Sequence, residues 1–280
     1  MIKLIECPRD AMQGWEYFIS TEKKINYLNT LLQVGFDTLD FGSFVSAKAI
    51  PQLADTKDVL PKLQLTNTKL LAIVANVRGA EEAANYNEIS YLGFPFSISE
   101  TFQQRNTNSS IEQSLHTVEA IQNICLQKNK QLVIYISMGF GNPYGDEYSP
   151  EIAAKWVQRM AQLGIKIISL SDTIGIGNGE NIAYLFKHLI PLYPDVEIGA
   201  HLHTTPNSWK TKVEAAFNNG CKRFDGALKG FGGCPMASDK LTGNMPTENL
   251  ISFFQQQKID LKINQEKLTT AMMQADSVFV

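Results

Sequence analysis

The chain has 280 residues, of which 44% are hydrophobic and 19% charged, and its formal net charge is −3 at pH 7. This length and apolar content suit a globular protein with a large core. The acidic balance and the lack of a basic run argue against a nucleic-acid partner. No apolar stretch approaches the roughly 18 residues that a membrane span needs.

The two ends of the chain carry no targeting signal that we can identify. The first residues read MIKLIECPRDAMQ, in which the apolar run is too short for a signal peptide and meets Arg9 and Asp10 at once. The last residues, ADSVFV, are not a peroxisomal address. We therefore expect a cytoplasmic protein whose four cysteines, which show no CxxC spacing, are thiols rather than a disulfide framework.

Short apolar runs alternate along the chain with longer amphipathic segments. The apolar runs predict eight strands, near 2–7, 37–42, 69–75, 89–96, 131–137, 166–171, 196–203 and 222–228. The amphipathic segments predict helices near 22–34, 54–63, 80–87, 110–128, 150–163, 180–192, 207–219, 247–257 and 264–278.

Two of these helices have clear end signals. Ser149 is an expected N-cap with Pro150 at the first helical position, and Gly164 is the expected stop. Ser109 with Glu112 forms an expected capping box for the helix near 110–128. These signals fix where the two helices lie relative to the strands around them.

Eight strands alternating with eight helices predict a (β/α)8 barrel, the TIM barrel, as one domain over 1–280 with an additional C-terminal helix at about 264–278. The alternative is an open doubly wound sheet. A dinucleotide-binding version of that fold would have GxGxxG after its first strand, where this chain has CPRDAMQG. The later stretch GIGNG is a weaker match and is typical of a flexible loop.

Barrel enzymes carry their chemistry at the carboxyl ends of the strands, and the polar side chains of this sequence collect there. The opposite ends mostly hold Lys, Asp and Gly. The candidate site residues at the carboxyl ends are Arg9, Asp10, Gln13, Asp40, Ser43, Lys48, Asn106, Asp172, Thr173, His201 and His203.

His201 and His203 lie in the stretch GAHLHTTP, at the end of the seventh predicted strand. Alternate residues of a strand face one side, so both imidazoles face the barrel interior while Leu202 faces the helices. Two satisfied buried histidines and a metal site fit this pattern equally well. Asp10 favours the metal, although it could instead cap a helix or pair with Arg9. Two histidines and a carboxylate suit catalytic Mg²⁺, Mn²⁺, Co²⁺ or Fe²⁺.

The loop 230–244, GFGGCPMASDKLTGN, follows the last predicted strand. Its glycines precede Cys234, and a mobile lid that carries a reactive thiol to a site is one use of such a loop. A long surface loop with an incidental cysteine is the alternative, which length and glycine content favour.

Six motifs together resemble those of the 3-hydroxy-3-methylglutaryl-CoA lyase family: PRDAMQ, GSFVSAK with PQ, SETFQQRN with SIE, SLSDTIGIG, HLH, and GFGGCP with TGNMPTENL. They occur in the family's order and cover nearly the whole chain. The resemblance implies a barrel metallo-enzyme that cleaves hydroxymethylglutaryl-CoA to acetyl-CoA and acetoacetate by retro-Claisen chemistry. It also implies Mg²⁺ or Mn²⁺ as cofactor, an acyl-CoA substrate and a homodimer.

The resemblance also assigns roles to individual residues. Four are expected to bind the metal: Asp10, His201, His203 and Asn244. Four are expected to be catalytic, with the first stabilising the enolate oxygen and the second transferring a proton: Arg9, Cys234, Asp40 and Asp172. Five are expected to contact the substrate: Gln13, Ser43, Asn106, Thr173 and Lys48. The expected contact of Lys48 is with the CoA phosphates and rests on its predicted loop position at the mouth, which Arg105 and Lys240 share; a solvated surface charge is the favoured alternative for each of the three.

The sequence departs from the family's pattern near the expected pocket. After HLH the family usually has Asp and Tyr-Gly, where this chain has Thr204, Thr205 and Pro206. Glu16 stands in place of a usual Lys, Asp40 in place of Glu, and the family's GPRDGLQ reads CPRDAMQ here. A related acyl-CoA with a different branch therefore stays open. A Claisen-condensing acyltransferase of the isopropylmalate synthase type and a catalytically silent metal- or acyl-CoA-binding barrel also stay open.

Overall fold

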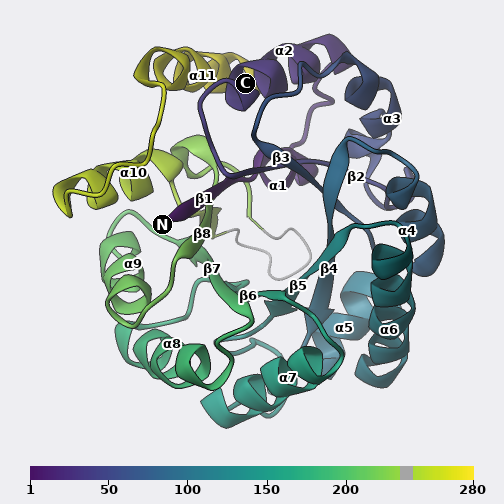
Figure 1. Cartoon of the computed structure of the whole chain (residues 1–280), viewed down its shortest axis with the longest axis vertical. Coiled ribbons are helices and arrows are strands. Elements are labelled where there is room, and N and C mark those ends of the chain that lie inside the picture. Colours follow the sequence, from purple (N-terminus) through teal and green to yellow (C-terminus); the bar gives the residue numbers. More distant parts are fainter. Residues whose placement is uncertain (234–241) are drawn as a thin grey trace.

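The computed structural model describes residues 1–233 and 242–280. At its centre lies a ring of strands that the helices surround (Figure 1). The eight barrel strands are β1 (Lys3–Glu6), β2 (Thr38–Ser43), β3 (Lys69–Ile73), β4 (Ile89–Ser97), β5 (Gln131–Ser137), β6 (Ile167–Asp172), β7 (Glu197–Thr204) and β8 (Arg223–Gly226). Each predicted strand matches one of these to within two residues at either end.

Strand pairing closes the ring. β1 pairs with both β2 and β8, and β6 pairs with β7, so that the eight strands form one continuous parallel barrel. The predicted (β/α)8 barrel is therefore confirmed, and the open sheet is excluded. A short ninth strand, β9 (Gly243–Asn244), pairs antiparallel with β7 and sets Asn244 opposite His203.

Most helices lie where periodicity predicts them. They are α2 (Thr21–Leu32), α3 (Thr56–Val59), α4 (Val77–Ala84), α6 (Ile111–Gln127), α7 (Pro150–Gln162), α8 (Gly179–Leu192), α9 (Trp209–Asn218), α10 (Thr247–Gln256) and α11 (Gln265–Val278). The segment predicted as one helix over 54–63 is a single α-helical turn between the 3-10 turns η1 (Pro51–Leu53) and η2 (Leu60–Lys62). Proline near the start of both 3-10 turns explains this break.

Two helices were not predicted, α1 (Pro8–Gln13) and α5 (Glu100–Thr107). Both leave the carboxyl end of a strand, β1 and β4 respectively, and both are two turns or fewer. Such short segments contain too few repeats for a helical period to stand out. Their importance is positional, because they carry Asp10 and Asn106 to the mouth of the barrel.

One predicted helix start is wrong by a residue. The N-cap of α6 is Ser110, whose hydroxyl accepts from Gln113 N while the Gln113 side chain accepts from Ser110 N. Ser109 instead bonds the hydroxyl of Ser114. Glutamine and glutamate both serve at the third position of a capping box. The sequence is therefore compatible with a box of Ser109 with Glu112 and with one of Ser110 with Gln113, and the structure has the second. The Ser149 cap and the Gly164 stop of α7 are confirmed.

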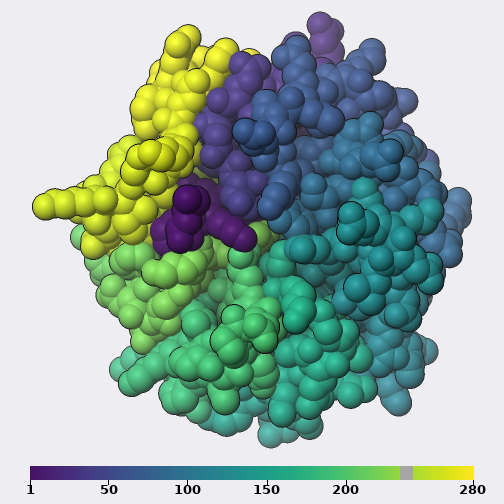
Figure 2. All heavy atoms as spheres, in the orientation of Figure 1, coloured from purple at the N-terminus to yellow at the C-terminus, as the bar shows by residue number. Residues whose placement is uncertain are grey.

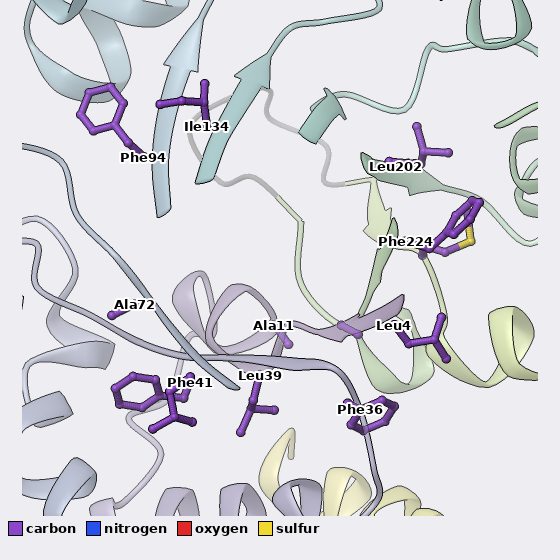
Figure 3. Close-up of a cluster of buried hydrophobic side chains, with 14 of the residues drawn as sticks. Leu4, Ala11, Phe36, Leu39, Phe41, Ala72, Phe94, Ile134, Leu202 and Phe224 are labelled. Atoms are coloured by element: carbon purple, nitrogen blue, oxygen red, sulfur yellow. The ribbon is translucent and has the colours of Figure 1, made fainter. Parts of the chain in front are cut away.

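Strand side chains divide into two sets. One set packs between the barrel and the helices in the main hydrophobic core, which includes Leu39, Phe94, Leu202 and Phe224 (Figure 3). The residues between them face the barrel interior, where a separate apolar cluster is formed by Leu71, Ile73, Tyr91, Val133, Tyr135 and Ile167. Leu202 thus faces the helices, as predicted, and its two histidine neighbours face inward.

The C-terminal helix α11 packs against α2 on the outside of the barrel (Figures 1 and 2). Phe279, which follows it, contacts the rings of Trp15, Tyr27 and Phe231. The predicted helix at 264–278 is confirmed in position. Among the helices that the structure describes, none is both long and apolar enough to cross a bilayer.

Glu6 is a buried carboxyl that forms hydrogen bonds with residues before and after the undescribed segment 234–241. It accepts hydrogen bonds from Leu228 N at 2.9 Å and from the Thr247 hydroxyl at 2.5 Å. Burial raises its pKa from 4.5 to about 8 despite these bonds. The folded protein therefore holds a proton on Glu6 at neutral pH that the unfolded chain releases.

This difference predicts a pH-dependent stability. Between about pH 4.5 and 8 the folded state binds the extra proton, so the free energy of unfolding falls by about 1.4 kcal/mol per pH unit from this group. Glu6→Gln keeps the shape and removes the charge, so the variant should lose less stability between pH 6 and 8. Denaturant unfolding at several pH values checks this, with Glu22→Gln on the exposed side of α2 as control. An unchanged slope contradicts the prediction.

Candidate active site

A cavity of about 200 Å³ opens at the carboxyl ends of the strands. Polar side chains of Arg9, Asp10, His201 and His203 form one side of it. The other side has an apolar wall that the sequence analysis did not identify, which contains Val45, Ile50, Ile73, Pro95 and Phe102. A cavity with carboxylate, guanidinium and imidazole groups on one side and apolar side chains on the other is typical of a site for a small molecule that has a polar group attached to a carbon chain.

Asp10, His201 and His203 come together although 191 residues separate the first two in sequence. One ligand atom from each lies within 4.8 Å of the other two. Asp10 reaches this place on α1, and both histidines reach it on the inward face of β7. Within the described part of the chain, Asp10 Oδ2 and His203 Nδ1 are buried without a hydrogen-bond partner. Buried orphan ligand atoms at this spacing fit a divalent cation.

Asn244 joins this group from the far side of the undescribed segment. It pairs with His203 through β7 and β9 and is 3% exposed. Its Nδ2 donates to Phe231 O at 2.9 Å, and its side chain contributes to lowering the pKa of Asp10. Asn244 therefore lies beside His203 and near Asp10.

The charges of this group favour metal ligation at neutral pH. Burial would raise the pKa of Asp10, but Arg9 and then the two histidines outweigh it and hold that pKa at about 2. Burial, followed by the nearby His201, lowers the pKa of His203 to about 4. Asp10 is thus an anion and His203 a neutral base at pH 7, which are the forms that bind cations.

His201 is held by residues that the sequence analysis missed. Its Nδ1 lies 3.1 Å from Asp225 Oδ2, and Asp225 Oδ1 lies 4.0 Å from Arg223 Nε. Arg223 in turn donates to Glu197 at 3.1 Å. Burial lowers the pKa of His201, but the bond to Asp225 outweighs it and the net shift is upward. The alternation of Arg223 and Asp225 on one face of β8 was the available signal.

Arg9 is held in a network of acceptors. Its Nε and Nη2 donate to the Asp40 carboxylate, with the Nη2 bond at 2.5 Å, and its Nη1 donates to Asp10 at 2.9 Å and to Gln13 at 2.8 Å. Among the described residues these bonds use four of the five guanidinium N–H groups, so one Nη2 hydrogen remains for the cavity. The net effect of the two carboxylates is to raise the pKa of Arg9 despite burial.

Some of the other residues predicted for the site line the cavity and some do not. Gln13, Asn106 and Thr173 line it, together with Arg9 and the group of Asp10, His201 and His203. Asp40 lies behind Arg9 rather than in the cavity lining, and burial raises its pKa to about 6 although Arg9 opposes the shift. Cys234 lies outside the described residues.

Three predicted residues are placed away from the cavity lining. Asp172 faces outward between Ser171 and Thr173, and its carboxylate binds Lys212 Nζ at 2.5 Å and Gly177 N at 3.0 Å. Ser43 is buried and accepts from Val45 N at 3.1 Å. Lys48 is exposed. None of these three residues lines the cavity in the part of the chain that the structure describes.

Comparisons with known proteins place these features in a family context. A family model described as HMGL-like matches residues 2–274. A hydroxymethylglutaryl-CoA lyase of Bacillus subtilis is 32% identical over 94% of this chain and 88% of its own length. The human 3-hydroxy-3-methylglutaryl-CoA lyase named cytoplasmic is 30% identical over 96% of this chain and 73% of its own.

Solved structures agree with these sequence matches. An HMG-CoA lyase from Acenitobacter baumannii in complex with coenzyme A and 3-methylmalate superposes with a TM-score of 0.92 at 30% identity, covering 100% of this chain and 91% of that one. The Bacillus subtilis HMG-CoA lyase structure also gives 0.92 at 30% identity, covering 99% and 93%. A pyruvate carboxylase from Rhizobium etli, at 15% identity and 0.76, shares the fold alone.

Proposed function

The chain belongs to the HMGL-like family, and from this we propose that it is a divalent-metal-dependent lyase that cleaves 3-hydroxy-3-methylglutaryl-CoA to acetyl-CoA and acetoacetate. The observation that carries the proposal is the convergence of Asp10, His201 and His203 beside Arg9 in one cavity. Retro-Claisen cleavage requires a base for the tertiary hydroxyl and a fixed positive charge for the enolate that forms. Arg9, which lines the cavity, offers the positive charge.

We propose Asp10, His201, His203 and Asn244 as the residues that hold the ion. The unpartnered buried atoms of Asp10 and His203, and the nitrogen and oxygen ligands of the four residues, fit Mg²⁺ or Mn²⁺ better than a closed structural Zn²⁺ site. When bound, the ion supplies positive charge that lowers the pKa of a substrate hydroxyl. The protein's part is to keep Asp10 ionised, mainly through Arg9, and His203 neutral, mainly through burial.

Arg9 is proposed to meet the enolate oxygen. The hydroxyl proton passes to a base, for which Cys234 in its thiolate form is the proposed group. The bond between C2 and C3 of the acyl group then breaks, the hydroxyl carbon becomes a ketone, and the electron pair moves onto the thioester carbonyl. A guanidinium that is permanently charged and already oriented loses little energy in reorganising when that charge appears. Its remaining Nη2 hydrogen is the donor available for this purpose.

The other predicted catalytic residues take supporting roles in this proposal. Asp40 orients Arg9 through two bonds, and Asp172 fixes the turn after β6 through Gly177 and Lys212. Lys212 also donates to the backbone oxygen of His203 at 2.8 Å, so the ion pair of Asp172 and Lys212 stabilises the end of β7 that carries His203. Cys234 is proposed, on the resemblance alone, as the proton-transfer group, which takes the proton of the substrate hydroxyl and returns it to C2 of the enolate.

The substrate is proposed to lie across the cavity. Gln13, Asn106 and Thr173 supply polar contacts, and the apolar wall near Ile73 and Phe102 accepts the alkyl branch. Ser43 is proposed to shape this wall through Val45, and exposed Lys48 remains a proposed contact for the CoA phosphates.

Steady-state cleavage of 3-hydroxy-3-methylglutaryl-CoA tests the proposed reaction. The protein is stripped of metal with a chelator and assayed for acetyl-CoA release before and after Mg²⁺ or Mn²⁺ is added. Cleavage that returns with the ion supports the proposal. Release of no acetyl-CoA under any metal condition contradicts it, as does release that chelation leaves unchanged.

We also propose a cytoplasmic homodimer. The bacterial relative and the relatives named cytoplasmic support the location, although other relatives are named mitochondrial. The subunit surface is not assigned. Light scattering of the purified protein and fractionation of its host cells measure the two properties directly.

Asp225 provides a prediction about metal affinity that does not depend on turnover. Because Asp225 accepts from His201 Nδ1, it leaves Nε2 for the ion. Partners of this kind usually change metal affinity by about 10- to 100-fold when replaced. We expect Asp225→Asn to raise the Mn²⁺ dissociation constant by that factor, as measured by the electron paramagnetic resonance of free Mn²⁺.

The matched control is Ser169→Ala. Ser169 is as deeply buried in the barrel as Asp225, and within the described residues its hydroxyl has no hydrogen-bond partner. Thermal unfolding of both variants separates lost affinity from lost folding. An Mn²⁺ dissociation constant that is the same in Asp225→Asn and in the unmodified protein rules out the orienting role.

A further inference from the structure

We propose that the barrel contains a second cation site, formed by Cys7, His201 and Asp225, which takes thiophilic divalent ions such as Zn²⁺ or Cd²⁺. One ligand atom from each of the three lies within 4.8 Å of the other two. All three face the barrel interior, beneath the Asp10 site and sharing His201 with it. The binding proposal stands alone, and its inhibitory consequence rests on the proposed function.

The spacing of the nitrogen and oxygen atoms already suits an ion. Two such ligands on a tetrahedral ion lie about 3.3 Å apart, given bonds of about 2.0–2.1 Å. His201 Nδ1 and Asp225 Oδ2 are 3.1 Å apart. The sulfur of Cys7 has to approach by little more than about 1 Å, since a Zn–S bond of about 2.3 Å places it roughly 3.5 Å from the other ligands.

A second observation points into the same space. Asp225 Oδ1 and the Tyr135 hydroxyl are both buried, and neither has a hydrogen-bond partner among the residues that the structure describes. Such atoms are costly unless an ion or water satisfies them. Asp225 is free to use this oxygen as a ligand while Arg223, at 4.0 Å, stays paired with Glu197.

The sulfur ligand of Cys7 selects for cations that bond strongly to sulfur. Burial raises the pKa of Cys7, and Asp225, Asp40 and Asp10 raise it further, so the group is a thiol in the absence of an ion. Among residues 1–233 and 242–280, the hydrogen-bond partner of the Cys7 thiol is Ile5 O, at 3.8 Å, which is a weak contact. An ion that bonds strongly to sulfur can displace the proton to solvent, whereas Mg²⁺ and Mn²⁺ prefer oxygen ligands and leave the thiol protonated.

Occupation of this inner site disturbs the outer one. The inner ion takes His201 Nδ1 and so replaces the hydrogen bond to Asp225 that orients the ring for Asp10 and His203. A thiophilic ion therefore inhibits Mg²⁺- or Mn²⁺-dependent turnover through the shared His201, without binding Asp10 or His203. His201 lines the cavity and also belongs to the group with Cys7 and Asp225, so an ion that enters the cavity reaches the inner site beside this residue.

The binding test uses sulfur-to-metal charge-transfer absorption with Cd²⁺ or Co²⁺ in the full-length Cys234→Ser protein, which removes the other thiol expected near the mouth. We expect one equivalent of ion to develop the band. Cys7→Ala and Cys7→Ser should each lose it, and Cys125→Ala, which removes a buried thiol on α6, should retain it. A band that persists in both Cys7 variants overturns the site, as does its absence from the Cys234→Ser parent.

The activity test uses the unmodified protein and Cys7→Ala. Even a residue that only supports a ligand changes affinity by about 10- to 100-fold, so loss of the sulfur ligand should raise the inhibitory Zn²⁺ concentration at least about tenfold. Basal turnover with Mg²⁺ should remain. Equal Zn²⁺ sensitivity of the two proteins overturns the inhibitory role. Because the absorption band requires no turnover, failure of the proposed lyase activity is recognised separately.

Discussion

Replacement of Arg9 by lysine is expected to lower kcat by about 100- to 1,000-fold, the loss typical of removing one directed donor that meets a developing oxyanion. Lysine keeps the positive charge beside Asp40 and Asp10, so the change removes geometry rather than charge. Arg9 donates in three directions at once, and a single ammonium cannot hold Asp40 and Gln13 while presenting a donor to the cavity.

The measurement is kcat and KM for thioester cleavage together with Mn²⁺ affinity. Because Arg9 acts on charge that forms in the transition state, kcat should fall far more than KM rises. Arg159→Lys, on the exposed face of α7, is the control. Mn²⁺ affinity within a few-fold of the unmodified protein shows that the metal group survives. A kcat close to the unmodified value means that another donor meets the enolate.

The sequence predicts that Asp10, His201 and His203 lie close together, because their positions follow from strand parity and barrel closure. His201 and His203 alternate around Leu202, which must face the apolar helices, and this alone turns both imidazoles inward. Asp10 comes directly after the first strand, so barrel closure brings it to the same mouth. These inferences need only the fold class and the period of two.

The same parity would have placed Asp172 correctly had it been applied there. Ser171 and Thr173 line the cavity, so the carboxylate between them faces outward to Lys212. The family motif drew attention to Asp172 as a catalytic residue, and the local alternation was the more direct guide to its position. Polar residues at strand ends, such as Asp172, can stabilise the loops that carry a site without lining it.

The contacts of Asp225 were beyond what sequence alone specifies. Its approach to His201 depends on the register between β7 and β8, in which those two residues are partners. Register in a barrel is set by how all the strands shear against one another, and no pattern within one strand reveals it. Gly199 adds a second condition, since a Cβ there would lie 2.9 Å from the Arg223 side chain.

Removal of His203 is expected to have the second large effect, the loss of metal-dependent turnover. His203 is 2% exposed, and its low pKa of about 4 keeps it an unprotonated ligand well below neutral pH. An ion that polarises a substrate oxygen contributes several kcal/mol, and each 1.4 kcal/mol is tenfold, so His203→Ala should lower turnover by roughly 100- to 10,000-fold. Calorimetric titration with Mn²⁺ should show a matching loss of affinity.

The chain supplies its own controls, because its other two histidines lie on the surface. His116 has a side chain that is 73% exposed, and His188 is exposed on α8. His116→Ala and His188→Ala should therefore keep both Mn²⁺ affinity and turnover. Because His203 is buried, His203→Ala leaves a cavity and should also lower the free energy of unfolding. Thermal unfolding with and without Mn²⁺ separates this loss of stability from the loss of metal binding. Unmodified His203 protein should gain stability from Mn²⁺ by mass action. A variant that gains as much retains the ion, and His203 is then not a ligand.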